Sequence, residues 1–221
     1  MKTSPILDKP SLIAQFKDFI LKKSHPCIMA QTVFKMDEYS IKEYNSLGSK
    51  ETAAEILKDL RNYIDKYDFT SNNFETFIAI FPSENFEDEI TFEKALWSQL
   101  KTINELDSTP WDSSVANDPT STKFSFSILG TAFYIVGLHP NSSRKARQAP
   151  YPALVFNLHL QFEKLREMGT YQRVKNRIRK RDIKLQGSVN PVLKDFGEAS
   201  EALQYSGRNV GENWKCPFHQ N

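Results

Sequence analysis

This chain of 221 residues lacks most of the features that identify the common protein classes. It has two cysteines, Cys27 and Cys216, which stand almost a full chain length apart. Disulfide scaffolds need several cysteines, and zinc motifs need them in closely spaced pairs, so neither class is indicated. The simplest interpretation is a protein of a reducing compartment, and we expect a cytoplasmic location.

Long apolar runs are also missing. No stretch approaches the roughly 20 apolar residues that span a bilayer, and the first ten residues, MKTSPILDKP, lack the apolar segment of a secretion signal. We therefore expect no membrane partner. The sequence contains no P-loop, no GxGxxG fingerprint, no HExxH motif and no Ser-His-Asp order. These absences argue against the common NTPase, dehydrogenase and hydrolase classes.

The net charge is nearly balanced, with 29 basic and 27 acidic residues and a formal charge of +2. This gives no reason to expect nucleic acid as a partner. The basic residues are nevertheless concentrated between residues 166 and 184. Such a run could form a nucleic-acid or anion-binding module. We favour the solvated face of a helix, because apolar residues recur there at near-helical spacing. They are Tyr171, Val174, Ile178 and Leu185.

Hydrophobic periodicity predicts an α+β fold. Helical spacing of apolar residues indicates helices at 11–23, 52–67, 91–106, 158–168 and 171–185. Alternating or continuous apolar stretches indicate strands at 31–35, 74–81, 123–128, 132–138 and 153–156. Gly130 separates two of these strands, which we expect to form an antiparallel hairpin. We predict one domain over residues 1–221, with a mixed or antiparallel sheet covered by several amphipathic helices and an irregular C-terminal tail from about residue 186.

Four histidines occur in the chain, namely His25, His139, His159 and His219. His159 is predicted in the first turn of a helix, with Asn157 as the N-cap. The positive end of a helix dipole disfavours a protonated imidazole, and neutral imidazole is the form that binds metals. Two interpretations stay open for His159: a metal or heme ligand, or a buried histidine that fixes the turn from strand to helix.

The segment 141–147 places hydroxyl groups and cations between two of the histidines. Arg144 and Arg147 are three residues apart, so in a helical turn they would point the same way. Such a loop suits a phosphate, a carboxylate or a heme propionate, although an exposed basic loop fits equally. Cys27 follows a proline, and its thiolate could ligate heme iron. The alternative is the small buried residue that a free cysteine usually is.

Several blocks of the sequence resemble the YqcI/YcgG family. The first is GLHPNSSR at 137–144, and the longest is PYPALVFNLHLQFE at 150–163. Shorter blocks are GSVNP at 187–191, QYSGR at 204–208 and WKCPF at 214–218. The Pro26-Cys27 pair also resembles the family's N-terminal region. The resemblance therefore spans nearly the whole chain.

Characterised relatives in that family include heme-dependent N-hydroxylases of guanidine groups in guanitoxin and cycloserine biosynthesis. The resemblance implies a heme b cofactor whose iron inserts one oxygen atom into an N–H bond of a small guanidine or amine substrate. The oxidant would be either dioxygen with an external electron donor or peroxide, because the chain is too short to include a reductase domain in addition to a heme fold. A non-catalytic heme-binding or heme-handling protein is the alternative. The oligomeric state is left open.

The resemblance also implies roles for individual residues. His159 is our first choice as the axial ligand of the iron, with His139 and Cys27 as the alternatives. Arg144 and Arg147 are expected to bind the heme propionates. Glu163 is our candidate for the catalytic carboxylate that holds a guanidinium group by a bidentate contact.

Overall fold

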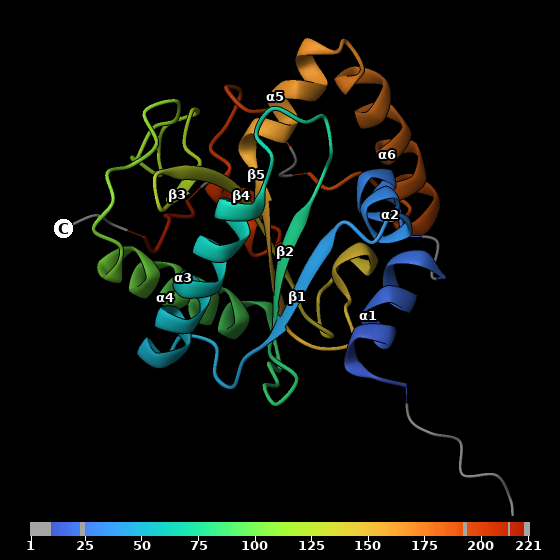
Figure 1. Ribbon diagram of the computed structural model, residues 1–221. Coiled ribbons are helices and arrows are strands. Elements are labelled where there is room, and N and C mark those ends of the chain that lie inside the picture. The colour runs from blue at the N-terminus through green and yellow to red at the C-terminus, as the bar shows by residue number, and fades with distance from the viewer. Residues whose placement is uncertain (1–9, 23–24, 192–193, 212, 219–221) are drawn as a thin grey trace, which may run out of the picture.

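The computed structural model describes residues 10–22, 25–191, 194–211 and 213–218. A five-stranded sheet in the order β1-β2-β5-β4-β3 lies between two layers of helices (Figure 1). Its first two strands are parallel and all other neighbours are antiparallel, which confirms the α+β class and the mixed sheet. The strands are β1 Tyr39–Glu43, β2 Thr76–Ile80, β3 Phe126–Ile128, β4 Thr131–Leu138 and β5 Ala153–Leu158.

The helices divide between the two faces of the sheet. In Figure 1, α3 and α4 lie on one side of the strands, and α1, α2 and α6 lie on the other. The bounds are α1 Leu12–Leu21, α2 Ile28–Lys35, α3 Lys50–Lys66, α4 Glu89–Leu106, α5 His159–Glu167, α6 Tyr171–Gln186 and α7 Ala202–Tyr205. Five of them correspond to the five predicted helices, and β3 and β4 form the expected hairpin.

One predicted element is wrong. The stretch 31–35, expected as a strand, belongs to α2. Thr32 and Val33 favour a strand locally, but the five-residue pattern was too short to reveal a helical period. The helix instead buries Phe34, whose ring stacks on Tyr39 at 4.4 Å between centroids and on Phe16 at 6.0 Å. Tertiary packing therefore overrides the local preference.

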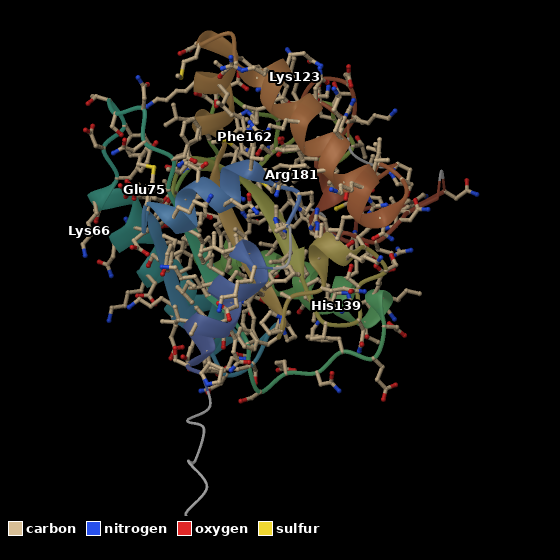
Figure 2. The ribbon with its side chains drawn as sticks, turned by 90° about the vertical axis from the view of Figure 1, so that its right-hand side faces the viewer. Lys66, Glu75, Lys123, His139, Phe162 and Arg181 are labelled. Carbon is tan, nitrogen blue, oxygen red and sulfur yellow. The ribbon has the colours of Figure 1, made fainter. Side chains whose placement is uncertain are left out.

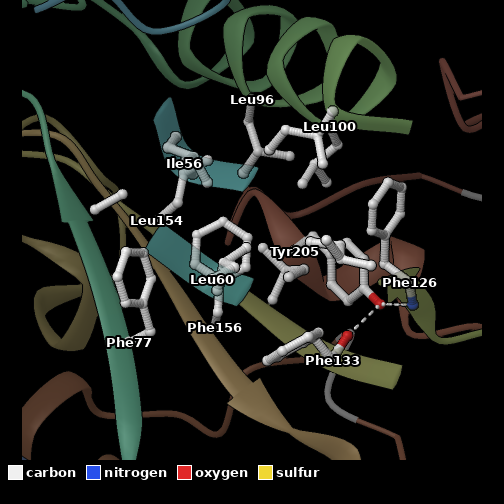
Figure 3. Close-up of a cluster of buried hydrophobic side chains, with 14 of the residues drawn as sticks. Ile56, Leu60, Phe77, Leu96, Leu100, Phe126, Phe133, Leu154, Phe156 and Tyr205 are labelled. Atoms are coloured by element: carbon white, nitrogen blue, oxygen red, sulfur yellow. Dashed lines mark hydrogen bonds between the residues drawn. The ribbon is translucent and has the colours of Figure 1, made fainter. Parts of the chain in front are cut away.

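The larger core lies between the sheet and α3 and α4 (Figure 3). Most of its largest fully buried side chains are phenylalanines, such as Phe77, Phe126 and Phe156. The C-terminal segment belongs to this core, because the Tyr205 hydroxyl accepts a hydrogen bond from the Phe126 backbone N–H at 3.0 Å. The segment expected to be irregular from residue 186 therefore contains the short helix α7 and anchors it to β3.

Gly137 marks the closest approach between β4 and its neighbours. A Cβ atom there would lie 2.7 Å from Leu96, 2.8 Å from Phe92 and 2.9 Å from the carbonyl oxygen of Tyr205. One of these neighbours is a backbone atom, which cannot rotate away. The residue must therefore be glycine for α4 and α7 to pack on the strand.

We predict that Gly137→Ala lowers the free energy of unfolding by about 1–3 kcal/mol, the usual cost of overpacking a core. Gly211→Ala is the control, because no atom lies within 4 Å of a Cβ built at that position. Urea denaturation of both variants provides the measurement. Equal stability of the two variants would contradict the close packing described here.

Candidate functional site

Burial alternates along the two central strands of the sheet. Residues of β4 and β5 that face α4, such as Phe133 and Phe156, are fully buried. Those that face α2 and α6, such as Val136 and Val155, are only partly buried although helices cover them. The difference arises because a cavity of about 340 Å³ lies on that face. This is at the small end of the range for small-molecule sites, roughly 300–1,000 Å³.

Polar links, rather than close apolar packing, hold α6 over the cavity. Near the end of α6, Asp182 forms a buried ion pair with Arg144, and Arg144 also donates to the hydroxyl and carbonyl oxygens of Ser188. Near its start, Lys175 pairs with Asp195. Between them, Arg181 donates to the carbonyl oxygen of His25 at 2.8 Å. The helix is thereby fixed while the space beneath it stays open.

His25 is a structural residue of the cavity wall. Its Nε2 lies 3.0 Å from the carbonyl oxygen of Ala146, and its Nδ1 accepts a hydrogen bond from the Cys27 backbone N–H at 3.3 Å. Burial, together with the nearby charges of Arg147 and Arg181, lowers the pKa of His25 to about 4. The ring is therefore neutral at pH 7, and both of its nitrogens are occupied.

Cys27 also lines the cavity, directly before the first turn of α2. Its Sγ accepts a hydrogen bond from the Ala30 backbone N–H at 3.4 Å, so the thiol caps the helix. Burial raises the pKa of Cys27, while the backbone N–H groups of Ala30 and Met29 oppose this rise. The protonated thiol therefore predominates at neutral pH in the unliganded site. Cys216, in contrast, is buried in the core on the opposite face of the sheet.

Arg144 and Arg147 both line the cavity, as the predicted helical turn required. The turn is a 3-10 helix, η1, at Lys145–Arg147. Their charges are balanced differently, because Arg144 is paired with Asp182 and Arg147 donates only to carbonyl oxygens. Within the described part of the chain, no carboxylate forms an ion pair with Arg147.

The hydrogen bonds of the Arg147 guanidinium go to backbone carbonyl oxygens. It donates to Gly137 O at 2.8 Å and to Gln204 O at 3.1 Å, which ties β4 to α7. Burial lowers the pKa of Arg147, but an arginine stays protonated at neutral pH. Carbonyl dipoles compensate such a charge only in part. An anionic group in the cavity would complete the compensation.

His159 is the first residue of α5 and lies in the cavity wall, with 5% of its surface exposed. The predicted N-cap role of Asn157 is wrong, because Asn157 belongs to β5, which runs directly into the helix. The imidazole lies between two carboxylates. Its Nε2 is 3.3 Å from Glu163 Oε1, and its Nδ1 is 3.6 Å from Glu201 Oε1. The buried Nδ1 has no hydrogen-bond partner among the described residues.

Glu163 lies at the edge of this site. Its side chain is 42% exposed, it pairs with Arg166, and it is not among the residues that line the cavity. Of the two carboxylates beside His159, Glu201 is the one that lines the cavity, and its side chain is 7% exposed. Sequence reasoning missed Glu201 because the tail was expected to be irregular. The only signal was the spacing of Glu201 and Tyr205, four residues apart, which places both on one turn.

His139 lies outside the cavity. It is fully buried and stacks on Phe92 of α4, with 4.5 Å between ring centroids, and neither ring nitrogen has a partner in the described structure. Burial lowers its pKa. Figure 2 shows His139 far from Phe162, a residue of α5 that lines the cavity. His219 lies outside the described residues.

The alternation of side chains along a strand explains why His139 and His159 lie on different faces of the sheet. Side chains of a strand alternate between its faces. His159 continues the series of Val155 and Asn157, which face the cavity, whereas His139 continues the series of Phe133 and Ile135, which face α4. The structure therefore brings four of the expected residues together in the cavity wall, places Glu163 at its edge beside His159, and leaves His139 on the other face of the sheet. The four are Cys27, Arg144, Arg147 and His159.

The cavity wall carries more positive than negative groups. Its walls are mostly apolar, with Phe16, Ile78 and Val136 among them. Six basic and four acidic side chains interrupt this surface. They are Arg144, Arg147, Arg166, Lys175, Arg179 and Lys194, against Glu75, Asp182, Asp195 and Glu201. The arrangement suits a largely apolar ligand with anionic groups.

The chain belongs to the YqcI/YcgG family, whose sequence profile matches residues 16–219. It is similar to the uncharacterised protein YqcI of Bacillus subtilis (strain 168), with 26% identity over 206 residues. That match covers 87% of this chain and 80% of the Bacillus protein. No solved structure matches the chain significantly.

The described residues contain neither a membrane-spanning helix nor a cluster of metal-binding side chains. Every described helix is too short or too polar to cross a bilayer. The same residues include no group of three or more His, Cys, Asp or Glu side chains that could hold a metal ion. A heme needs fewer protein ligands than a bare metal ion, because the porphyrin already binds the iron and the chain adds only one or two axial ligands.

The buried, neutral His25 makes stability depend on pH. Its pKa in the folded chain lies below the unfolded value of 6.5, so the unfolded chain takes up a proton first as the pH falls. The stabilisation is complete above pH 6.5 and is lost toward pH 4. We predict that, between about pH 7.5 and pH 5, the wild type loses about 2 kcal/mol more unfolding free energy than His25→Gln. Urea denaturation at each pH measures this difference, and parallel pH profiles would contradict it.

Proposed function

We propose that the cavity binds heme b and that the chain is a heme-dependent oxygenase that N-hydroxylates a guanidine or amine group of a small molecule. The observation that supports this most is one apolar cavity whose wall includes two features. One is a buried histidine with an unpartnered nitrogen, His159, and the other is a partly buried guanidinium without a carboxylate partner among the described residues, Arg147. Family membership supports the choice of heme and of the reaction. We further propose that the protein acts in the cytoplasm.

The residues of the cavity fit a heme. Apolar walls suit the faces of a porphyrin, and Arg147 suits a propionate, with Arg144 beside it. His159 suits the iron, because the ligating histidine of a metal site usually donates its second nitrogen to a carboxylate. Its Nε2 lies 3.3 Å from Glu163 Oε1, and its Nδ1 has no hydrogen-bond partner among the described residues. A macrocycle needs more room than the cavity of about 340 Å³ provides, so heme binding would require side chains of its wall to move.

Bound heme would supply the activation of dioxygen and the transfer of one oxygen atom to nitrogen. The chain's own groups would position the other participants. Glu201, rather than the more exposed Glu163, is placed to accept a guanidinium group, because it is the carboxylate that lines the cavity beside His159. The mostly apolar walls would exclude water from the reacting nitrogen. An external donor would supply the electrons.

The alternative is a heme-binding or heme-handling protein without turnover. The same cavity and the same His159 support it, because neither feature requires a reaction. The two proposals share the prediction that heme binds. They differ in whether a hydroxylated product forms.

The proposal is tested by hemin titration of the wild type and three variants. We expect a Soret band at about 400–420 nm for the wild type, which is lost or strongly shifted in His159→Ala. Cys27→Ser keeps a helix cap while it removes the thiol, and His139→Phe replaces a histidine outside the cavity. Both of these variants should keep the wild-type spectrum. If the spectrum changed in Cys27→Ser but stayed unchanged in His159→Ala, the axial ligand would be Cys27 and not His159.

Product analysis separates the oxygenase from the heme-handling protein. The heme-loaded chain is incubated with arginine and small guanidines, a reductant and dioxygen, and mass spectrometry detects the added oxygen atom. Glu201→Gln should raise KM for a guanidine substrate and leave the Soret band in place. A wild type that remains colourless with hemin would refute both proposals. Heme binding without product across the substrates would favour heme handling.

A further inference from the structure

Four basic side chains form a straight row on the outer face of α6, and we call them the basic row. They are Arg173, Arg177, Lys180 and Lys184. Their spacing of four, three and four residues places them on one stripe of the helix. All four are exposed, and none forms an ion pair with any residue that the structure describes. Figure 1 shows α6 at the edge of the molecule, with this face free of other elements.

The basic row is not balanced by acidic residues of its own helix. Among the residues of α6, only Asp182 is acidic, and it is buried and paired with Arg144. Like charges four residues apart destabilise a helix by about 0.2–0.5 kcal/mol per pair. The four positive charges of the row therefore repel one another and create a positive potential at this face. An anionic partner would relieve the repulsion.

The opposite face of the same helix lines the cavity. Val174 and Ile178 of α6 lie in its wall, and Lys175 lines it between them. A helix with its side chains is about 10–12 Å thick. A partner on the basic row would therefore be separated from the cavity by a single helix.

We propose that the basic row docks an acidic electron-carrier protein that reduces the cofactor in the cavity. This inference rests on the proposed oxygenase function. N-hydroxylation by dioxygen breaks one N–H bond and forms an N–O bond. The second oxygen atom leaves as water, so the reaction consumes two electrons and two protons. The carrier would supply the electrons in two one-electron steps and be oxidised itself.

The shape of the row favours a protein over a nucleic acid. The row is about 17 Å long at a rise of 1.5 Å per residue, and it lies on one convex helix rather than in a groove. Two exposed apolar residues flank it in the sequence, Met168 before the start of α6 and Ile183 next to Lys184. Electron-transfer complexes use small contacts steered by charge, often below about 1,200 Å². The sequence pI of about 8.4 is below the value above 9 that is typical of nucleic-acid-binding domains.

The test is a charge reversal with a matched control. Arg177→Glu/Lys180→Glu reverses an Arg and a Lys three residues apart in the basic row. Lys58→Glu/Arg61→Glu makes the same change on α3, where both side chains are also exposed, in the helix layer on the other side of the sheet. Stopped-flow absorbance follows reduction of the heme-loaded chains by a reduced acidic flavodoxin. Dithionite, a small reductant, controls for an intact heme site.

We expect the reversal on α6 to slow reduction by flavodoxin at low salt at least about tenfold, within the range of electrostatic steering. The reversal on α3 should change the rate less than about twofold. At 1 M salt, where the Debye length is about 3 Å, the three chains should converge. Reduction by dithionite should not differ. Equal rates for wild type and Arg177→Glu/Lys180→Glu at low salt would overturn the proposal.

A binding measurement distinguishes this failure from a failure of the oxygenase proposal. Fluorescence anisotropy with labelled flavodoxin, and separately with a labelled DNA duplex, uses the chain without heme. Salt-dependent flavodoxin binding that is lost in the α6 variant supports the docking surface even if heme does not bind. Flavodoxin binding that is equal in both variants overturns it. DNA binding that depends on Arg177 and Lys180, without flavodoxin binding, would assign the row to nucleic acid instead.

Discussion

The buried ion pair between Arg144 and Asp182 connects the loop after β4 to α6, and the cavity depends on it. Removing one partner of such a pair typically costs about 3–5 kcal/mol, because the other charge stays buried without compensation. The pair therefore fixes α6 in a position where it covers the sheet without filling the space above Val136 and Val155. The same loop positions Arg147, so one short segment both holds the cavity open and supplies its unpaired charge.

The electrostatics of the site follow from this arrangement. His25 is kept neutral by burial and by the two arginines around it, and Cys27 is kept protonated mainly by burial. Neither residue compensates the charge of Arg147. The carboxylates that flank the His159 ring are Glu163, near Nε2, and Glu201, near the unpartnered Nδ1, and Glu201 is the more deeply buried. The cavity wall thus contains both an arginine without a carboxylate partner among the described residues and a histidine that lies between two carboxylates.

Much of the fold could be predicted from the sequence. The long helices have strong apolar stripes, and the hairpin around Gly130 has a clear turn signal. The strand expected at 31–35 was wrong, because a five-residue pattern is too short to distinguish the period of a helix from that of a strand. Strand β1 at Tyr39–Glu43 was not predicted, because its residues at the sheet edge are only partly buried.

The site was harder to predict than the fold, because it depends on which face a residue occupies. His139 and His159 both follow a strand, and the sequence gives no sign of which side of the sheet holds the cavity. Glu201 reaches the site from a tail segment whose position depends on the packing of Tyr205 against β3. Contacts between segments so distant along the chain have no local sequence signal. That Arg144 and Arg147 point to the same side could be predicted, because they stand three residues apart within one helical turn.

The central claim is that the space above Val155 is the ligand site. Val155→Phe would fill that space from the middle of the sheet, while its neighbours Leu154 and Phe156, which face α4, stay unchanged. Hemin titrations of wild type and Val155→Phe, followed by absorbance, test the claim directly. The account predicts at least about tenfold weaker binding in the variant, equivalent to about 1.4 kcal/mol, with no loss of thermal stability. Equal hemin affinity in a folded variant would contradict it.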